Sequence, residues 1–183
     1  IRDHCVTGVQ TCALPISPAL PSVLFCYAFG KAQRLLAELH SLGVEEEVLL
    51  HGAIQGLMEP YRTAGIAMVP TQPLSALRKG ENLAGRLVLA PPSAMGTPWM
   101  RRFSKAQTAF ASGWMAVRGA RRRRGVGRGF VLSDHADWPS LVRTIMESGA
   151  QHVVLTHGQG DLLARYLQEV EGIHASTLKR SEA

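Results

Sequence analysis

The chain has 183 residues, enough for one ordinary domain or two small lobes, and its 46% hydrophobic and 19% charged content excludes global disorder. The most apolar stretch, residues 14–29, contains three prolines, falls short of the roughly 18–20 residues of a membrane span and lacks the basic start of a signal peptide. We therefore expect no membrane segment. The formal net charge is +6, so we expect an anionic partner. The three cysteines form no metal-binding pair and do not require an oxidising compartment, so we expect a cytoplasmic protein.

Residues 1–17 fit neither a helix nor a strand, and they do not lead into the segment that follows. The stretch VTGVQTCALPI, residues 6–16, reverse-translates codon by codon into a common sequencing-adapter oligonucleotide, and a chance match over eleven codons is very improbable. We therefore expect residues 1–17 to be a sequence artefact and the native protein to extend upstream. A natural, poorly structured N-terminus is the alternative.

Short apolar runs alternate with segments of helical spacing from residue 18 to residue 92. The apolar runs are rich in strand-forming residues and end near glycine or proline, whereas the residues after Gly30 place apolar side chains on one helical face. This alternation predicts an α/β fold with a parallel sheet. The expected strands are residues 23–27, 48–50, 66–69 and 86–90, and the expected helices are residues 31–42 and 57–64.

Residues 101–128 form a basic tract with nine Lys or Arg residues and no Asp or Glu. Four consecutive arginines and four aromatic residues lie in the tract or near its edge: Arg121, Arg122, Arg123, Arg124, Trp99, Phe103, Phe110 and Trp114. We expect the arginines to contact the phosphate backbone of a nucleic acid, the alternative being a solvated loop. The two tryptophans either stack on unpaired bases or belong to the core. Ser93, in a Pro-Pro-Ser turn after an expected strand, is a further candidate for a phosphate contact, the alternative being a plain turn serine.

Two histidines follow expected strands in the last third of the sequence. His135 comes after the expected strand 130–133, and His157 comes after the expected strand 153–156. Helices are expected to Glu147, with Asp137 as the N-cap, and over residues 162–170, while the tail from residue 175 is expected to fray. Because the carboxyl ends of parallel strands line up along one edge of a sheet, both imidazoles are expected on one rim. A metal nuclease uses such histidines as a metal ligand and as a proton donor or phosphate contact, the alternative being helix caps or surface residues.

The segment FVLSDHADWPSLVRTIMESGAQHVVLTHGQGDLL resembles the β-CASP pattern of a Ser-x-His-Ala-Asp element followed by a Thr-His-Gly element, with the two histidines 22 residues apart. The segments FCYAFGKAQRLLAEL, VLAPPSAMGTPWMRRF and FASGWMAVRGARRRRGVGRGFVLSDHADW extend the resemblance over residues 18–180. They are similar to the bacterial ligase-associated DNA exonucleases of the metallo-β-lactamase superfamily. The resemblance implies that His135 contacts the scissile phosphate and protonates the leaving oxygen, and that His157 is a metal ligand. Asp137 then either caps its helix only or also orients a neighbour of the metal site.

The resemblance also implies a fold, an activity and partners. Residues 18–118 would be a partial β-CASP domain with a parallel α/β sheet, and residues 119–183 the C-terminal return segment of a metallo-β-lactamase αββα domain. The activity would be 3′-to-5′ hydrolysis of DNA by two divalent metal ions, zinc or manganese, in repair with an ATP-dependent DNA ligase. An RNA-processing β-CASP ribonuclease and a non-catalytic nucleic-acid-binding module are the alternatives.

The sequence departs from the superfamily in its metal signature, because His-x-His-x-Asp-His occurs nowhere in it. Beyond residue 17 the aspartates are Asp134, Asp137 and Asp161, and none stands where the family has its metal-bridging aspartate. A two-metal site needs several histidine and carboxylate ligands, so we expect this chain alone to bind zinc weakly and to cleave nothing. Lys31 is expected to begin a helix at the surface, and His51 to be structural.

Overall fold

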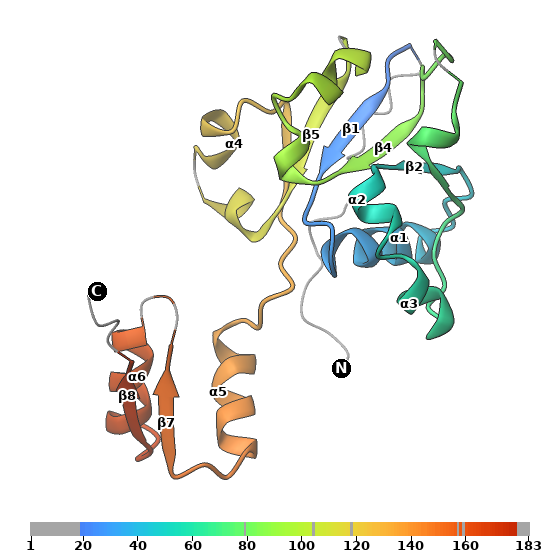
Figure 1. Ribbon diagram of the computed structural model, residues 1–183. Helices are drawn as coiled ribbons and strands as arrows, with labels where there is room; N and C mark the ends of the chain where they lie inside the picture. Colours follow the sequence, from blue (N-terminus) through green and yellow to red (C-terminus); the bar gives the residue numbers. More distant parts are fainter. Residues whose placement is uncertain are drawn as a thin grey trace. The chain divides into compact units, whose positions relative to one another are not determined.

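The computed structural model describes residues 19–78, 80–103, 105–117, 119–156, 158 and 160–178 (Figure 1). The expected artefact at residues 1–17 and the predicted metal ligand His157 lie outside the described residues. The chain forms two compact units, which divide between Asp134 and His135. Within the described ranges, no helix is long and apolar enough to cross a lipid bilayer.

The first unit contains a six-stranded sheet with the order β3-β2-β4-β1-β5-β6, in which every strand pair is parallel. β1 lies at the centre, with Leu24 opposite Leu89 of β4 and Ala109 of β5. The predicted α/β class with a parallel sheet is therefore confirmed. The strands are β1 (Ser22–Phe25), β2 (Val48–Leu50), β3 (Thr71–Pro73), β4 (Leu87–Ala90), β5 (Gln107–Ala111) and β6 (Arg128–Phe130).

Both faces of this sheet are buried, because its central strands are almost continuously apolar. β1 reads SVLF, β2 reads VLL and β4 reads LVLA, and every one of these residues is buried. Along β1, Leu24 packs in the core beside α1, whereas Val23 and Phe25 pack in a second core on the opposite face. Continuous burial of this kind is typical of parallel sheets that are covered on both sides.

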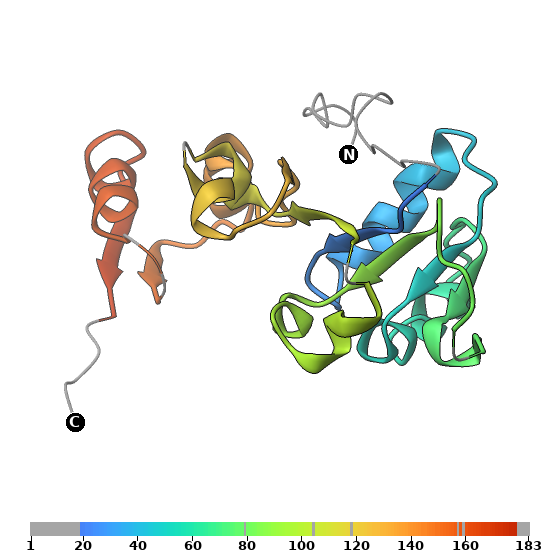
Figure 2. The same ribbon diagram turned by 90° about the horizontal axis from the view of Figure 1, so that it is seen from above.

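Helices cover one face of the sheet and short 3-10 segments cover the other (Figure 2). On the first face, α1 (Lys31–Ser41) contributes Leu35, Leu36 and Leu39, and α2 (Gly52–Gln55) contributes Ile54. On the second face, Leu74, Ala94 and Phe103 come from 3-10 segments. The remaining elements of this unit are α3 (Glu59–Thr63), α4 (Ala120–Arg123), η1 (Leu74–Ala76), η2 (Pro92–Ala94), η3 (Pro98–Phe103) and η4 (Gly113–Ala116).

Two strands of the sheet differ from their predicted positions, and a third was not predicted. Residues 66–69 form no strand, and β3 begins after Pro70 at the sheet edge, where Pro73 needs no second partner strand. β6 lies at residues 128–130 and ends where the predicted strand 130–133 begins. β5 lies inside the basic tract, and only Phe110 and Ala111 of its five residues are fully buried, so its apolar pattern is weak.

The second unit consists of α5 (Trp138–Glu147), β7 (His152–Leu155), α6 (Gly160–Glu169) and β8 (His174–Thr177), with β7 and β8 parallel. Its core contains Leu163 and Leu167 of α6, and Val142 and Ile145 of α5 pack against them. The prediction that the tail frays from residue 175 is wrong, because Ala175 is buried and pairs opposite Val153 in the two-stranded sheet.

The boundary between the units follows the sheet. Because β6 pairs with β5, residues 119–134 belong to the first compact unit, whereas the predicted domain boundary lies between residues 118 and 119. The assignment of the two parts to a β-CASP domain and a metallo-β-lactamase domain stays a prediction.

Candidate catalytic loop and nucleic-acid interface

The loop after β6 carries Ser133 and Asp134 at the carboxyl end of the six-stranded sheet. β6 ends at Phe130, and Leu132 is buried in the core beside α1. Sites of parallel α/β proteins form at this edge, because the loops that follow the strands converge there. The pairing of β6 with β5 therefore delivers the start of the Ser-Asp-His sequence to the edge where a site was expected.

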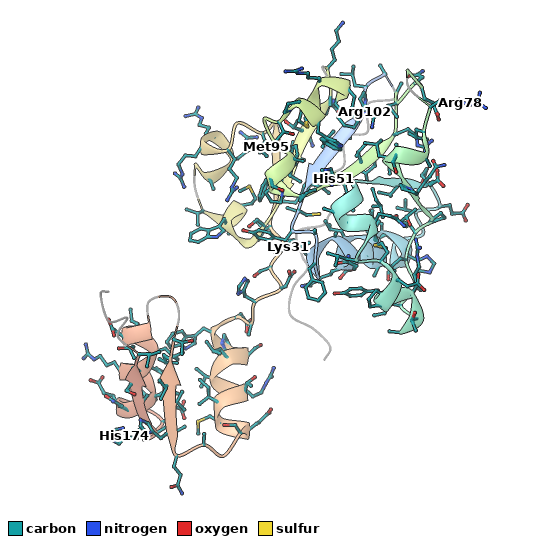
Figure 3. The ribbon with its side chains drawn as sticks, in the orientation of Figure 1. Lys31, His51, Arg78, Met95, Arg102 and His174 are labelled. Atoms are coloured by element: carbon teal, nitrogen blue, oxygen red, sulfur yellow. The ribbon has the colours of Figure 1, made fainter. Side chains whose placement is uncertain are left out.

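Helix α1 holds this loop through two basic side chains near its amino end, of which Lys31 is labelled in Figure 3. Lys31 Nζ lies 3.5 Å from Asp134 Oδ2, and only 3% of the Lys31 side chain is exposed. One turn further on, Arg34 Nη1 donates a hydrogen bond of 2.8 Å to the carbonyl oxygen of Ser133. Lys31 begins α1 as predicted, but its expected place at the surface is wrong, because its ammonium pairs with Asp134 and lies 5.3 Å from the centroid of the Tyr27 ring.

Two glycines lie against the same loop. Gly30 precedes α1 with a φ of +77°, in the left-handed region that favours glycine. Gly113 follows β5, and a Cβ at this position would lie 3.2 Å from Ser133 Cβ and 3.3 Å from Ser133 Oγ. Ser133 therefore packs directly against the backbone of Gly113, and the loop is held by α1 on one side and by the segment after β5 on the other.

Cys26 is buried at the end of β1, near the Lys31–Asp134 pair. Burial raises the pKa of its thiol to about 12, while Lys31 acts to lower this pKa and Asp134 acts to raise it. The thiol therefore stays protonated near neutral pH. A nucleophilic cysteine needs a thiolate, so Cys26 is a packing residue of this site.

His135 is exposed and is the first residue of the second unit. Two residues later, Asp137 caps α5, and its Oδ1 accepts a hydrogen bond of 2.9 Å from the backbone N–H of Ser140. Pro139 occupies the first turn of α5, where a missing N–H costs little. The predicted N-cap is confirmed, whereas the roles of His135 in catalysis and of Asp137 toward a metal site stay predictions.

The described residues do not assemble a metal centre. In the ranges given above, no group of three or more His, Cys, Asp or Glu side chains is arranged to hold a metal ion. His157 lies outside these ranges, so its distance from His135 is not defined. The expectation that the strands before the two histidines share one sheet is wrong: β6, which precedes His135, is a strand of the six-stranded sheet, whereas β7, which precedes residue 157, pairs with β8 in a separate two-stranded sheet. The metal pair that the resemblance implies does not fit the described residues alone.

The four consecutive arginines divide into two groups. All four are exposed, on α4 and directly after it. Arg121 Nη1 donates a hydrogen bond of 3.1 Å to the carbonyl of Gly127, and the Arg124 guanidinium carbon lies 4.2 Å from the centroid of the Phe110 ring. Arg122 and Arg123 have no hydrogen bond or ion pair with another described side chain. These two guanidinium groups are therefore engaged neither by a hydrogen bond nor by a ring of the described residues, and Arg123 Nη1 lies beside Gly119, where an added Cβ would be 3.2 Å away from it.

The aromatic residues and Ser93 also separate by their surroundings. Trp99 packs against the His51 ring, with centroids 5.0 Å apart, and against the Phe103 ring at 4.8 Å. Trp114 is 64% exposed. Ser93 is exposed in η2, which follows the carboxyl end of β4, and its phosphate contact stays a prediction.

His51 has a structural role in the described residues. Its Nδ1 accepts a hydrogen bond of 3.0 Å from the backbone N–H of Ala53 and so caps α2. Burial lowers the pKa of this imidazole, which favours the neutral ring that such an acceptor requires. The expectation that His51 is structural agrees with these contacts.

Comparisons with known proteins find a similarity to part of a protein named as a DNA ligase. No protein-family profile matches the chain, and no solved structure matches it. The chain is 33% identical over 147 residues to a protein named "Probable DNA ligase" from Opitutus terrae. The match covers 80% of this chain and 14% of that protein, so the chain spans a small part of the relative's length.

Proposed function

We propose that the chain is part of a DNA exonuclease of the metallo-β-lactamase/β-CASP type that works alongside a DNA ligase. The loop that leads to His135 carries the proposal: it follows the carboxyl end of a parallel strand, and Lys31 and Arg34 bind its Ser133–Asp134 part. The resemblance of residues 130–163 to the β-CASP pattern and the similarity to a protein named as a DNA ligase support it.

In this proposal His135 supplies the proton that the leaving group needs. In the hydrolysis of a phosphodiester, a water oxygen forms a new bond to phosphorus and releases its proton to solvent, while the bond between phosphorus and the bridging oxygen breaks. The bridging oxygen must gain a proton as it leaves. An imidazolium donates this proton from a ring nitrogen and later recovers one from water. His135 is an exposed residue, as a proton donor to a bound phosphate group must be.

We also propose that the intact protein uses two divalent metal ions, zinc or manganese, and that His157 is one of their ligands. The support is the Thr-His-Gly element at residues 156–158 and its resemblance to the family pattern. The described residues hold no metal cluster, so most of the ligands would be other residues, and we assign no step of the reaction to the ions.

The name of the relative supports a setting in DNA repair. A match to 14% of a protein named as a DNA ligase is consistent with a nuclease segment that serves strand joining, by trimming an end before it is sealed. We therefore propose a bacterial cytoplasmic protein with DNA as substrate and an ATP-dependent DNA ligase as partner. The 3′-to-5′ polarity comes from the family resemblance.

The test is the replacement His135→Ala in a full-length version of the protein, assayed with end-labelled DNA. Cleavage should be lost while DNA binding is retained, because the proposed proton donor is removed and the basic surface is unchanged. His40→Ala, at an exposed histidine of α1, is the matched control and should leave both properties unchanged. Full cleavage by the His135→Ala variant would refute the proposed role of His135.

A second candidate is a non-catalytic nucleic-acid-binding module. The exposed Arg122 and Arg123 favour it, because they bind a phosphate backbone without any catalytic group. If the full-length protein binds DNA but cleaves neither DNA nor RNA with zinc or manganese present, this second function replaces the first. Selective cleavage of RNA would instead identify an RNA-processing enzyme.

A further inference from the structure

Trp114 lies at the surface of the most basic part of the chain. It is 64% exposed in η4, and η4 packs against α4, which carries Arg122 and Arg123. We propose that Trp114 is a stacking platform for an unpaired base, and that these two arginines bind the adjacent phosphates of single-stranded DNA. This inference rests on the proposed function and names the form of DNA that the surface binds.

The backbone of η4 is fixed, so that the exposure of Trp114 is not the result of a loose segment. Ser112 Oγ accepts a hydrogen bond of 3.3 Å from the Trp114 N–H and caps η4. Met115, the next residue, packs in the second core, and a Cβ at Gly129 of β6 would lie 2.6 Å from Met115 Sδ. Met115 therefore anchors η4 on β6, while the neighbouring indole of Trp114 remains accessible to solvent.

The other two tryptophans have aromatic partners, whereas Trp114 has none among the described residues. Trp99 packs on the rings of His51 and Phe103, and Trp138 packs on Tyr166 with centroids 5.3 Å apart. Among the described residues, no ring lies in stacking or edge contact with Trp114. An indole face without a protein partner is available to a planar ligand.

The charge of the sequence on either side of Trp114 favours an anionic ligand. Residues 101–128 contain nine basic residues and no acidic residue, and Trp114 lies in the middle of this range. Polynucleotides combine planar rings with a negative charge at every unit, so one chain occupies both features at once. Bases in a duplex are stacked on each other, whereas a single strand offers an unstacked base to an aromatic side chain.

The experiment measures binding of the 183-residue chain to a fluorescently labelled oligothymidine, to a blunt DNA duplex and to an oligouridine. Trp114→Ala should raise the dissociation constant for oligothymidine between about 5-fold and 150-fold, the range that corresponds to about 1–3 kcal/mol for one stacked base. It should change the value for the duplex less than about 2-fold, because duplex binding relies on phosphate contacts.

Trp114→Phe, which keeps a smaller ring, should recover part of the lost affinity. Trp138→Ala is the matched control, because it removes a tryptophan that is 43% exposed and stands on α5, away from the basic tract in sequence. Circular dichroism should show unchanged secondary structure for Trp114→Ala, because this side chain buries little apolar surface.

Each other outcome overturns the platform. If Trp114→Ala weakens binding to duplex and single strand equally, or weakens neither, Trp114 does not stack on an unpaired base. The proposed nuclease function would then be decided separately, by the His135→Ala experiment. If the unaltered chain binds no DNA at all, both the platform and the DNA-binding part of the proposed function are refuted. Binding of oligouridine at least about 10-fold tighter than oligothymidine would refute DNA as the ligand.

Discussion

Lys31 and Asp134 form an ion pair that joins α1 to the last residue of the first unit, with Nζ and Oδ2 3.5 Å apart. The pair is asymmetric, because the Lys31 side chain is 3% exposed and the Asp134 side chain 38%. A buried ammonium without a partner carries a desolvation cost that water does not offset. The ion pair therefore holds the segment before His135 against the core. The buried Lys31 ammonium in turn needs the Asp134 carboxylate as its counter-charge.

Asp134→Asn should destabilise the first unit, because it leaves the Lys31 ammonium buried without its counter-charge. Breaking a fully buried pair costs about 3–5 kcal/mol, and the partial exposure of Asp134 reduces the expected loss to about 1–3 kcal/mol. Urea unfolding measures the change. Glu38→Gln is the control, because it removes the i,i+4 ion pair with Arg34. In that pair N and O are 3.7 Å apart and both side chains are 37% exposed, so the loss of stability should be under about 0.5 kcal/mol. Equal losses for the two variants would show that the buried lysine does not depend on Asp134.

Asp137→Ala should destabilise the second unit by about 1 kcal/mol, because the Ser140 N–H loses its acceptor at the start of α5. Asp137→Asn keeps an oxygen that accepts the same bond and should cost only a few tenths of a kcal/mol. Thermal unfolding followed by circular dichroism compares the two variants. If Asp137→Asn proves as unstable as Asp137→Ala, the carboxylate charge and not the cap is what stabilises this unit.

The same pair of variants separates the cap from the predicted role toward a metal site. If Asp137 does no more than cap α5, the Asp137→Asn variant of a full-length version of the protein should cleave DNA normally. Reduced cleavage with unchanged stability would instead indicate that the charge of Asp137 acts on the catalytic site.

Cys26 should resist modification and should make the first unit less stable at high pH. Burial raises the pKa of its thiol from 9.0 to about 12, so the unfolded chain releases this proton at lower pH than the folded protein. The contribution of the buried thiol is therefore complete below pH 9 and is lost as the pH rises from 9 toward 12.

A variant with Cys5→Ser and Cys12→Ser leaves Cys26 as the reporting thiol. A thiol reagent at pH 8 should label Cys26 only after urea is added, and Cys26→Ala in the same background should lose less stability than its parent between pH 8 and pH 10.5. Rapid labelling of the folded protein would contradict the burial of Cys26.

Three strands of the six-stranded sheet were predictable, because their burial has a cause that is visible in the sequence. β1, β2 and β4 are short apolar runs that end near glycine or proline, and burial on both faces requires that composition. The cap of α5 was predictable for a similar reason, since Asp137 and Pro139 act on the nearest turn of backbone.

The features that were missed depend on contacts between distant parts of the chain. β8 was missed because Ala175 is buried only through its pairing with β7 and its packing beside α6. The buried position of Lys31 was missed because its partner Asp134 comes from the other end of the unit. The local sequence shows a lysine at the start of α1. Only the folded structure shows that the Asp134 carboxylate lies beside this lysine and allows its burial.

Arg122 and Arg123 should dominate the electrostatic part of DNA binding. Replacing both with glutamine should weaken binding to every DNA sequence alike. It should also reduce the slope of the logarithm of the binding constant against the logarithm of the salt concentration by about 1.4–1.8, at roughly 0.7–0.9 for each phosphate contact. Arg124→Gln is the matched control, because its guanidinium already lies over the Phe110 ring. It should lower stability by about 0.5–1 kcal/mol and change the salt dependence little. Fluorescence anisotropy at several salt concentrations measures both effects, and a slope that falls only for Arg124→Gln would reverse the assignment of the phosphate contacts.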